Sequence, residues 1–150
     1  MSTLRSRAVK DFKKIFLDTS PIIYLLDSDK NFGEKTAEIF SQLSEQNVKF
    51  FSSVITIEEY LVYPYRKNNE LMIKSFWDLV TENKIILYSI NWNEANKAAK
   101  IRAEYKFFKP MDALQLAVAS LHGCDLFLTN DKQLKQFQEI SCVTVEEWQI

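Results

Sequence analysis

Short runs of consecutive apolar residues alternate with longer segments of helical periodicity along this chain. Apolar runs without polar alternation are typical of strands that are covered on both faces. The strands predicted in this way are Lys14–Leu17, Lys84–Tyr88 and Asp125–Thr129, with weaker versions at Val48–Ser52 and Cys142–Val145. Helical segments between successive strands favour an α/β fold, with three α/β/α layers around a mostly parallel sheet of roughly five strands.

Capping residues, prolines and a glycine indicate where helices begin and end. Pro21 and Pro110 each suit the first turn of a helix, whereas Gly123 suits the residue after a helix. Pro64 is expected to disturb the short helix that precedes it. The helices predicted from these signals cover about residues 21–27, 33–46, 57–61, 69–83 and 111–121.

Length and composition predict one domain. The chain has 150 residues, enough for a single core, and we expect that domain over residues 15–150, after a basic extension over residues 1–14. The net charge of −1 gives no overall attraction to a polyanion, so any nucleic-acid contact would depend on local Lys and Arg clusters. A membrane span and a signal peptide are both missing from the pattern, so we expect no membrane partner and a cytoplasmic protein.

The rare residue types exclude several kinds of site. Cys124 and Cys142 have no CxxC partner, and we expect reduced thiols. Gly33 and Gly123 are the only glycines, too few for a phosphate-binding glycine loop. The sole histidine, His122, lies late in a predicted helix and is expected to be non-catalytic.

Four acidic residues follow strands or open helices at the edge where the carboxyl ends of parallel strands meet: Asp18, Glu59, Asp112 and Asp131. Each alone could simply cap a helix or offset its dipole. Asp18 is the hardest to explain in that way, because it stands between two apolar runs where an unpaired charge is costly. Gathered together, four carboxylates need a cation, and all-oxygen ligands favour Mg²⁺ or Mn²⁺.

These motifs resemble the PIN-domain family and, within it, the VapC toxins of VapBC toxin–antitoxin pairs. The resemblance extends from about Ile15 to Val145 and implies the PIN fold. Its four motifs are Ile15–Leu25, Ser53–Tyr60, Pro110–Ala117 and Leu126–Asp131. Helical periodicity does not decide between Glu58 and Glu59, but the spacing within the second motif favours Glu59. The basic extension is not typical of the family.

The resemblance implies a metal-dependent endoribonuclease that is the toxin of a toxin–antitoxin pair. Asp18, Glu59 and Asp112 would be the inner ligands of Mg²⁺ or Mn²⁺, and Asp131 would support a second ion or a metal-bound water. The products would carry 5′-phosphate and 3′-hydroxyl ends. An antitoxin partner and a homodimer are also implied. Neighbouring side chains expected to hydrogen bond around the metal ligands are Thr19, Ser20, Thr129 and Asn130.

Basic and aromatic side chains near the third motif are candidates for holding RNA. The basic residues are Lys97, Lys100, Arg102, Lys106 and Lys109, which could equally form a solvated helix face. Phe107 and Phe108 could stack on bases, although such aromatics more often belong to the core. The tryptophans are interpreted as packing residues: Trp77, Trp92 and Trp148. A group of apolar residues is a candidate surface for a partner protein: Leu61, Val62, Tyr63 and Tyr65.

Three other functions compete with this one. A haloacid dehalogenase-type phosphotransferase needs a second Asp two residues after Asp18, where this chain has Ser20. A receiver domain needs adjacent acids at the end of the first strand and a late Lys, and neither is evident. A catalytically silent PIN-fold module that binds RNA or protein is the main alternative, and retention of all four acids argues against it.

Overall fold

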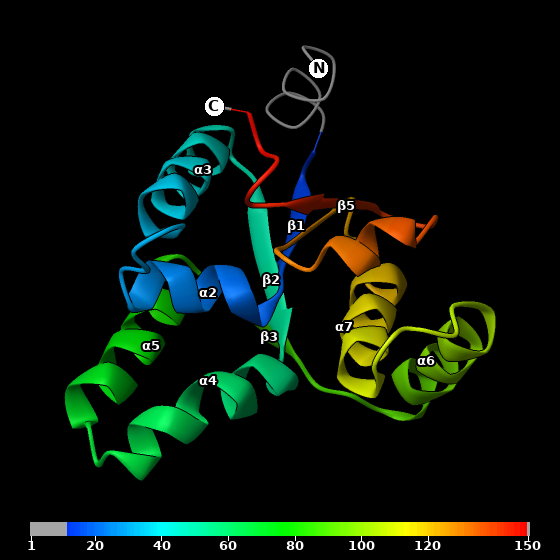
Figure 1. The fold of residues 1–150 in the computed structure, drawn as a ribbon, viewed down its shortest axis with the longest axis horizontal. Coiled ribbons are helices and arrows are strands. Elements are labelled where there is room, and N and C mark those ends of the chain that lie inside the picture. Colours follow the sequence, from blue (N-terminus) through cyan, green and yellow to red (C-terminus); the bar gives the residue numbers. More distant parts are fainter. Residues whose placement is uncertain (1–11, 150) are drawn as a thin grey trace.

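A fully parallel sheet forms the centre of the computed structural model, which describes residues 12–149 (Figure 1). The strands of this part of the chain are β1 (Lys14–Leu17), β2 (Lys49–Ser53), β3 (Ile86–Tyr88), β4 (Leu126–Thr129) and β5 (Ser141–Thr144), in the spatial order β3-β2-β1-β4-β5. Both the five strands and their parallel direction confirm the sequence prediction. Because β1 lies in the middle, Asp18 follows the central strand of the sheet.

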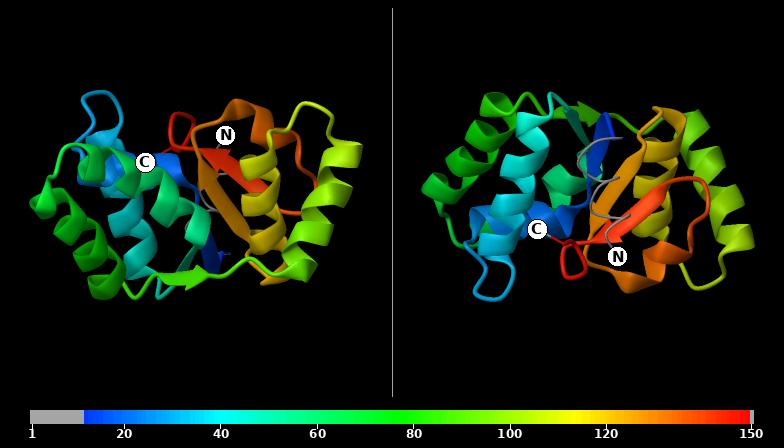
Figure 2. Two further views of the ribbon diagram at one scale, coloured as in Figure 1. Left: turned by 90° about the horizontal axis from the view of Figure 1, so that it is seen from below. Right: turned by 90° about the horizontal axis from the view of Figure 1, so that it is seen from above.

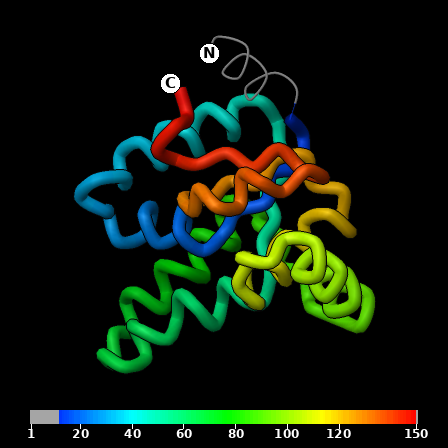
Figure 3. The backbone as a smooth tube through the Cα atoms, turned by 45° about the vertical axis from the view of Figure 1, so that its right-hand side comes forward, coloured from blue at the N-terminus to red at the C-terminus, as the bar shows by residue number. Residues whose placement is uncertain are grey.

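Helices cover both faces of the sheet, as the two views of Figure 2 show. They are α2 (Thr19–Leu26), α3 (Gly33–Glu45), α4 (Val54–Arg66), α5 (Glu70–Glu82), α6 (Trp92–Glu104) and α7 (Pro110–Leu121), followed by a short 3₁₀ helix, η1 (Lys132–Gln136). Helices α2 to α5 lie on one side, and α6 and α7 on the other. The α4–α5 pair extends away from the rest of the molecule in Figure 3.

The core is divided by the sheet into two apolar clusters. Successive side chains of a strand point to opposite faces, so Ile15 and Leu17 pack beneath α2 and α3, whereas Phe16 faces α7. Phe16 stacks on Phe127 of the neighbouring strand, with ring centroids 5.1 Å apart. Burial on both faces explains why these strands are continuous apolar runs in the sequence.

Two helices differ from the prediction. Helix α2 begins at Thr19, two residues early, because Asp18 caps it by accepting a hydrogen bond from the Thr19 amide. The expected short helix at residues 57–61 was wrong, because α4 has 13 residues and continues through Pro64. Pro64 lies in the last turn, where a missing amide donor removes only one helical hydrogen bond.

Other expectations are resolved by burial. Trp148 is buried, as predicted for a packing residue, but Trp77 is partly exposed and Trp92 is 91% exposed, so that interpretation was wrong for Trp92. The segment after Asp131 forms the 3₁₀ helix η1. None of the helices within residues 12–149 is long and apolar enough to cross a bilayer.

Most of the predicted basic extension, residues 1–11, lies outside the described residues, so the domain boundary stays a prediction.

Candidate active site

Asp18 is a buried carboxylate at the carboxyl end of the central strand, with 8% of its surface exposed. Its amide donates to the Leu128 carbonyl at 2.9 Å, which continues the β1–β4 ladder by one residue. Its Oδ1 accepts from the Thr19 amide at 2.9 Å, and its Oδ2 accepts from the Thr129 hydroxyl at 2.8 Å. Burial raises the pKa of Asp18 to about 6, against the lowering effect of these hydrogen bonds.

Glu59, on α4, is held towards Asp18 by a hydrogen bond. The Thr19 hydroxyl donates to Glu59 Oε1 at 2.6 Å. The preceding residue, Glu58, instead lines an apolar groove with Leu61 and Trp77. The two glutamates therefore face different surroundings, and Glu59 is the one bonded to the residue next to Asp18.

Asp112 lies in the first turn of α7 and is half-buried. Burial is the main cause that raises the pKa of Asp112, and the nearby charges of Asp131 and Glu59 raise it further. Lys109, at the N-cap of the same helix, lowers the pKa of Asp112. Lys109 is thus within electrostatic range of the acidic site.

Asp131 is joined to Asp18 through one hydroxyl group. Thr129 Oγ1 accepts from the Asp131 amide at 3.1 Å while it donates to Asp18. The Asp131 side chain caps η1 by accepting from the Gln133 amide at 3.0 Å. The end of β4 thereby links the backbone of Asp131 to the carboxylate of Asp18, and the charge of Asp131 acts on Asp112.

The four acids share one electrostatic environment at the carboxyl edge of the sheet. The charges of Asp112 and Glu59 raise the pKa of Asp18, and those of Asp131 and Glu59 raise the pKa of Asp112. Carboxylate oxygens are the donors that Mg²⁺ and Mn²⁺ prefer, so the residue types fit a hard cation. Within residues 12–149, however, no three Asp, Glu, His or Cys side chains are already gathered as a complete ligand set.

Of the predicted surrounding residues, Thr19 and Thr129 contact the acids directly. Asn130 is turned elsewhere, because its amide nitrogen donates to the Tyr24 hydroxyl at 3.0 Å and its amide oxygen accepts from the Glu146 amide at 3.2 Å. It fixes the loop after β4 to α2. Among the described residues, no side-chain hydrogen bond links Ser20 to these acids.

Two buried polar residues near the acids were missed in the sequence. Gln115, on α7, and Thr56, on α4, hydrogen bond to each other at 3.0 Å. The signal for Gln115 was a polar residue among Ala113, Leu116 and Ala117, which are all fully buried. A buried amide needs partners, and its position three residues after Asp112 indicated where to look.

The predicted RNA-binding residues are placed differently from one another. Lys97 forms an ion pair with Glu139 at 2.7 Å, which lowers the pKa of that glutamate. Lys100, Arg102 and Lys106 are exposed. Lys109 is the one of these residues whose charge lowers the pKa of Asp112. Whether any of them contacts RNA stays a prediction.

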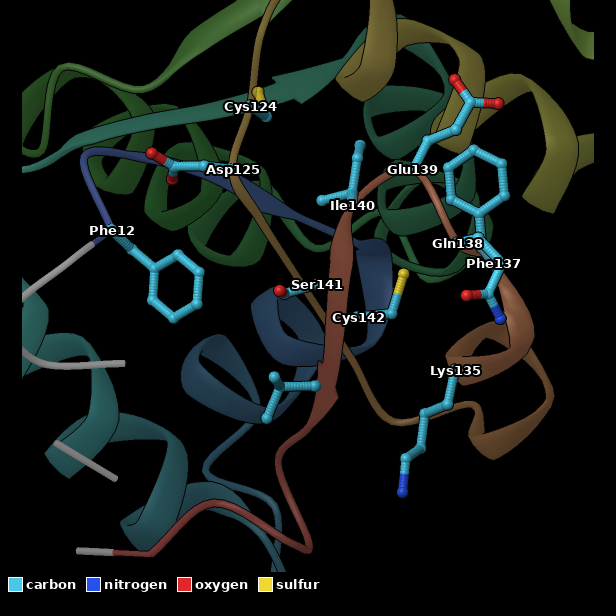
Figure 4. A pocket seen from close by; sticks show the side chains of 11 residues that line it. Phe12, Cys124, Asp125, Lys135, Phe137, Gln138, Glu139, Ile140, Ser141 and Cys142 are labelled. Atoms are coloured by element: carbon cyan, nitrogen blue, oxygen red, sulfur yellow. The ribbon is translucent and has the colours of Figure 1, made fainter. Parts of the chain in front are cut away.

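A cavity of about 690 Å³ lies beside strand β5 and contains none of the four acids (Figure 4). It is lined by Phe12, Cys124, Asp125, Cys142 and neighbouring residues. Burial raises the pKa of both thiols to about 12, so they stay protonated and unreactive at neutral pH. The Asp125 carboxylate is already used, since it accepts hydrogen bonds from the amides that begin β1. The cavity is therefore not a second candidate for chemistry.

Comparison with known proteins agrees with this architecture. The family model described as PIN domain matches residues 15–140. A chain of a toxin–antitoxin complex from Klebsiella pneumoniae is similar in structure, with a TM-score of 0.66 and 23% identity over 87% of this chain and 97% of that one. A chain of the VapBC2 complex from Rickettsia felis, bound to a DNA fragment from its promoter, has a TM-score of 0.68 and 13% identity over 87% and 98%.

Both structures share the fold at low identity, and no curated protein sequence gives a significant match. The family match, in contrast, extends from β1 through β4, ends just before β5 and contains each of the four acids. This chain belongs to the PIN domain family.

Proposed function

We propose that this PIN-domain protein is a metal-dependent endoribonuclease and the toxin of a toxin–antitoxin pair. The observation that carries the proposal is the group of four carboxylates that influence one another at the carboxyl edge of the sheet. Like charges so placed cost stability unless a cation binds them. The likeness in fold to two toxin–antitoxin complexes supports the biological role.

Asp18, Glu59 and Asp112 are the ligands in this proposal, and Asp131 supports a second ion or a metal-bound water. A bound Mg²⁺ or Mn²⁺ supplies an activated water and neutralises charge on the scissile phosphate. The chain's own contribution is to keep these oxygens in place: Thr129 holds Asp18, and Thr19 holds Glu59. The products then carry 5′-phosphate and 3′-hydroxyl ends.

In the same proposal, basic and aromatic residues just before the start of α7 hold the substrate RNA. Lys106 and Phe107 are exposed in the α6–α7 connection, and Lys109 lies within electrostatic range of Asp112. Phosphates pair with lysines, and unstacked bases lie on aromatic faces. These three side chains therefore suit a single-stranded substrate.

An antitoxin partner and a homodimer complete the proposal. Of the predicted partner surface, Leu61 is buried, whereas Val62, Tyr63 and Tyr65 are exposed on α4. Exposed apolar groups of this kind mark surfaces that bind another protein. Co-expression with the product of a neighbouring small gene, followed by size-exclusion chromatography, would show whether a stable complex forms and how many copies of this chain it holds.

The nuclease assay uses a matched pair of acidic residues on α4. Wild-type protein is incubated with single-stranded RNA in Mg²⁺ or in EDTA, beside Glu59→Gln and Glu58→Gln. We expect cleavage in Mg²⁺ only, a loss on the order of 100-fold for Glu59→Gln, and wild-type cleavage for Glu58→Gln, which faces the apolar groove. Equal activity with EDTA, or in both variants, would remove the metal mechanism.

A further inference from the structure

Gln115 is a buried amide at the centre of a hydrogen-bond network that reaches one of the four acids, Glu59, through Thr19. It lies on α7, three residues after Asp112, and is 1% exposed. Its Oε1 accepts from the Ser53 hydroxyl, and its Nε2 donates to Thr56 Oγ1 at 3.0 Å. Ser53 also caps α4 by accepting from the Ile55 amide. One side chain of α7 thus fixes the first turn of α4.

The network continues from Thr56 to the acidic site. Thr56 Oγ1 lies 2.8 Å from the Ser52 hydroxyl, whose one proton is also within reach of the Leu17 carbonyl at 2.8 Å. Thr56 Oγ1 also lies 3.2 Å from Thr19 Oγ1, within hydrogen-bond distance. Thr19 in turn donates its only proton to Glu59.

The two ends of this network have a fixed direction. The Gln115 amide nitrogen only donates and the Glu59 carboxylate only accepts, so Gln115 donates to Thr56 and Thr19 donates to Glu59. The contact between Thr56 and Thr19 joins these two bonds. Thr56 is fully buried and Thr19 is buried. Hydrogen bonds in such surroundings polarise one another, and a break anywhere leaves a buried group unpaired.

We propose that Gln115 is a positioning residue for the metal site, which holds Glu59 in register with Asp112 through Thr56 and Thr19. The proposal rests on the nuclease function proposed above and extends it to residues remote from the reacting atoms. Thr19 donates to Glu59 Oε1, and this bond orients the carboxylate while leaving lone pairs for a cation. Asp112 is on the same helix as Gln115, so the network ties ligands from α4 and α7 together.

The test measures Mn²⁺ binding directly, by the electron paramagnetic resonance signal of free Mn²⁺, as well as RNA cleavage. Gln115→Met and Thr56→Val each remove one link with little change in volume, and Thr56→Ser restores the hydroxyl. We expect Mn²⁺ binding to weaken about 10- to 100-fold in the first two, with kcat lowered and KM for RNA unchanged. Thr56→Ser is expected to bind Mn²⁺ as the wild type does.

Thr36→Val is the matched control for a purely structural effect. Thr36 is 1% exposed and its hydroxyl donates to the Phe32 carbonyl at 2.7 Å, away from the network. This variant should melt at a lower temperature yet keep wild-type Mn²⁺ affinity. Should Gln115→Met fail to fold, the Thr56→Val and Thr56→Ser pair decides the matter alone.

The outcomes separate this inference from the proposed function. If the wild type binds Mn²⁺ and cleaves RNA while Gln115→Met and Thr56→Val bind Mn²⁺ equally well, Gln115 is only a packing residue and the inference is overturned. If the wild type neither binds Mn²⁺ nor cleaves RNA, the nuclease proposal is overturned and the inference with it.

Discussion

The hydroxyl of Thr129 donates to Asp18 Oδ2 at 2.8 Å, across two adjacent strands whose residues are far apart in sequence. This bond opposes the effect of burial, which raises the pKa of Asp18. The same hydroxyl accepts from the Asp131 amide. One threonine thus supports both the first and the last acid of the site.

Replacing Thr129 should therefore weaken metal binding, although Thr129 is not itself a proposed ligand. In Thr129→Val the pKa of Asp18 rises further, so less of the carboxylate is ionised at pH 7. We expect Mn²⁺ affinity to fall about 10-fold and the free energy of unfolding to fall by about 1 to 2 kcal/mol. Titration of Mn²⁺ and urea unfolding measure the two effects. Thr129→Ser, which keeps the hydroxyl, is the control; identical behaviour of the two variants would contradict the role given to this bond.

Asp18→Asn should stabilise the metal-free protein at neutral pH. Because the pKa of Asp18 is raised from 3.8 to about 6, the folded protein holds a proton that the unfolded chain has lost between these values. Stability therefore falls as pH rises through that interval, and the full penalty, of order 3 kcal/mol, is present above it. Asn carries no charge and avoids this penalty, although its amide keeps only one oxygen to accept the hydrogen bonds that Thr19 and Thr129 donate to the carboxylate.

Urea unfolding in EDTA checks this prediction at two pH values. At pH 7.5 we expect Asp18→Asn to unfold with a free energy about 1 to 3 kcal/mol higher than the wild type, and near pH 4 the difference should largely vanish. A stability difference between the two proteins that stays the same at both pH values would show that burial of this charge is not costly.

Lys109→Ala should weaken RNA binding and make it less sensitive to salt. A lysine that pairs with one phosphate contributes about one unit to the slope of the logarithm of affinity against that of salt concentration. Fluorescence anisotropy of labelled RNA with metal-free protein measures that slope. Lys74→Ala is the control, because Lys74 forms an ion pair with Asp78 on α5 at 2.6 Å. Equal slopes for both variants would place the RNA elsewhere.

Two neighbouring phenylalanines should give opposite results. Phe107 is 79% exposed, so Phe107→Ala is expected to lower RNA affinity by about 1 to 3 kcal/mol per stacked base without loss of stability. Phe108 is buried, so Phe108→Ala is expected to cost about 3 to 5 kcal/mol of folding free energy. Anisotropy and chemical unfolding, carried out on both variants, separate the two roles. Unchanged RNA affinity for Phe107→Ala would show that Phe107 does not stack on RNA bases.

The strands and the acids were predictable for a physical reason. A parallel strand covered on both faces must be apolar throughout, so Asp18 after Ile15–Leu17 was conspicuous. The sequence favoured Glu59 over Glu58 through motif spacing alone. The hydrogen bond from Thr19 to Glu59 is a tertiary contact that supports this choice. The contribution of all four acids to catalysis remains a prediction.

Other features depended on tertiary contacts that no local pattern contains. The buried partners of Gln115 come from β2 and α4, about 60 residues earlier in the chain, so its role could not be seen from α7 alone. The length of α4 depended on Pro64 lying near a helix end, and the exposure of Trp92 on its position at the first residue of α6. Propensity is a weak guide where packing decides.

The central position of β1 has a consequence for the protein during its synthesis. β1 is made first, but one of its two neighbours, β4, ends only at Thr129, so the pairing of Ile15 with Leu126 must wait for most of the chain to leave the ribosome. Until then Asp18 lacks both the Leu128 carbonyl and the Thr129 hydroxyl. The hydrogen bonds around Asp18 can therefore be completed only after residues up to Thr129 have left the ribosome.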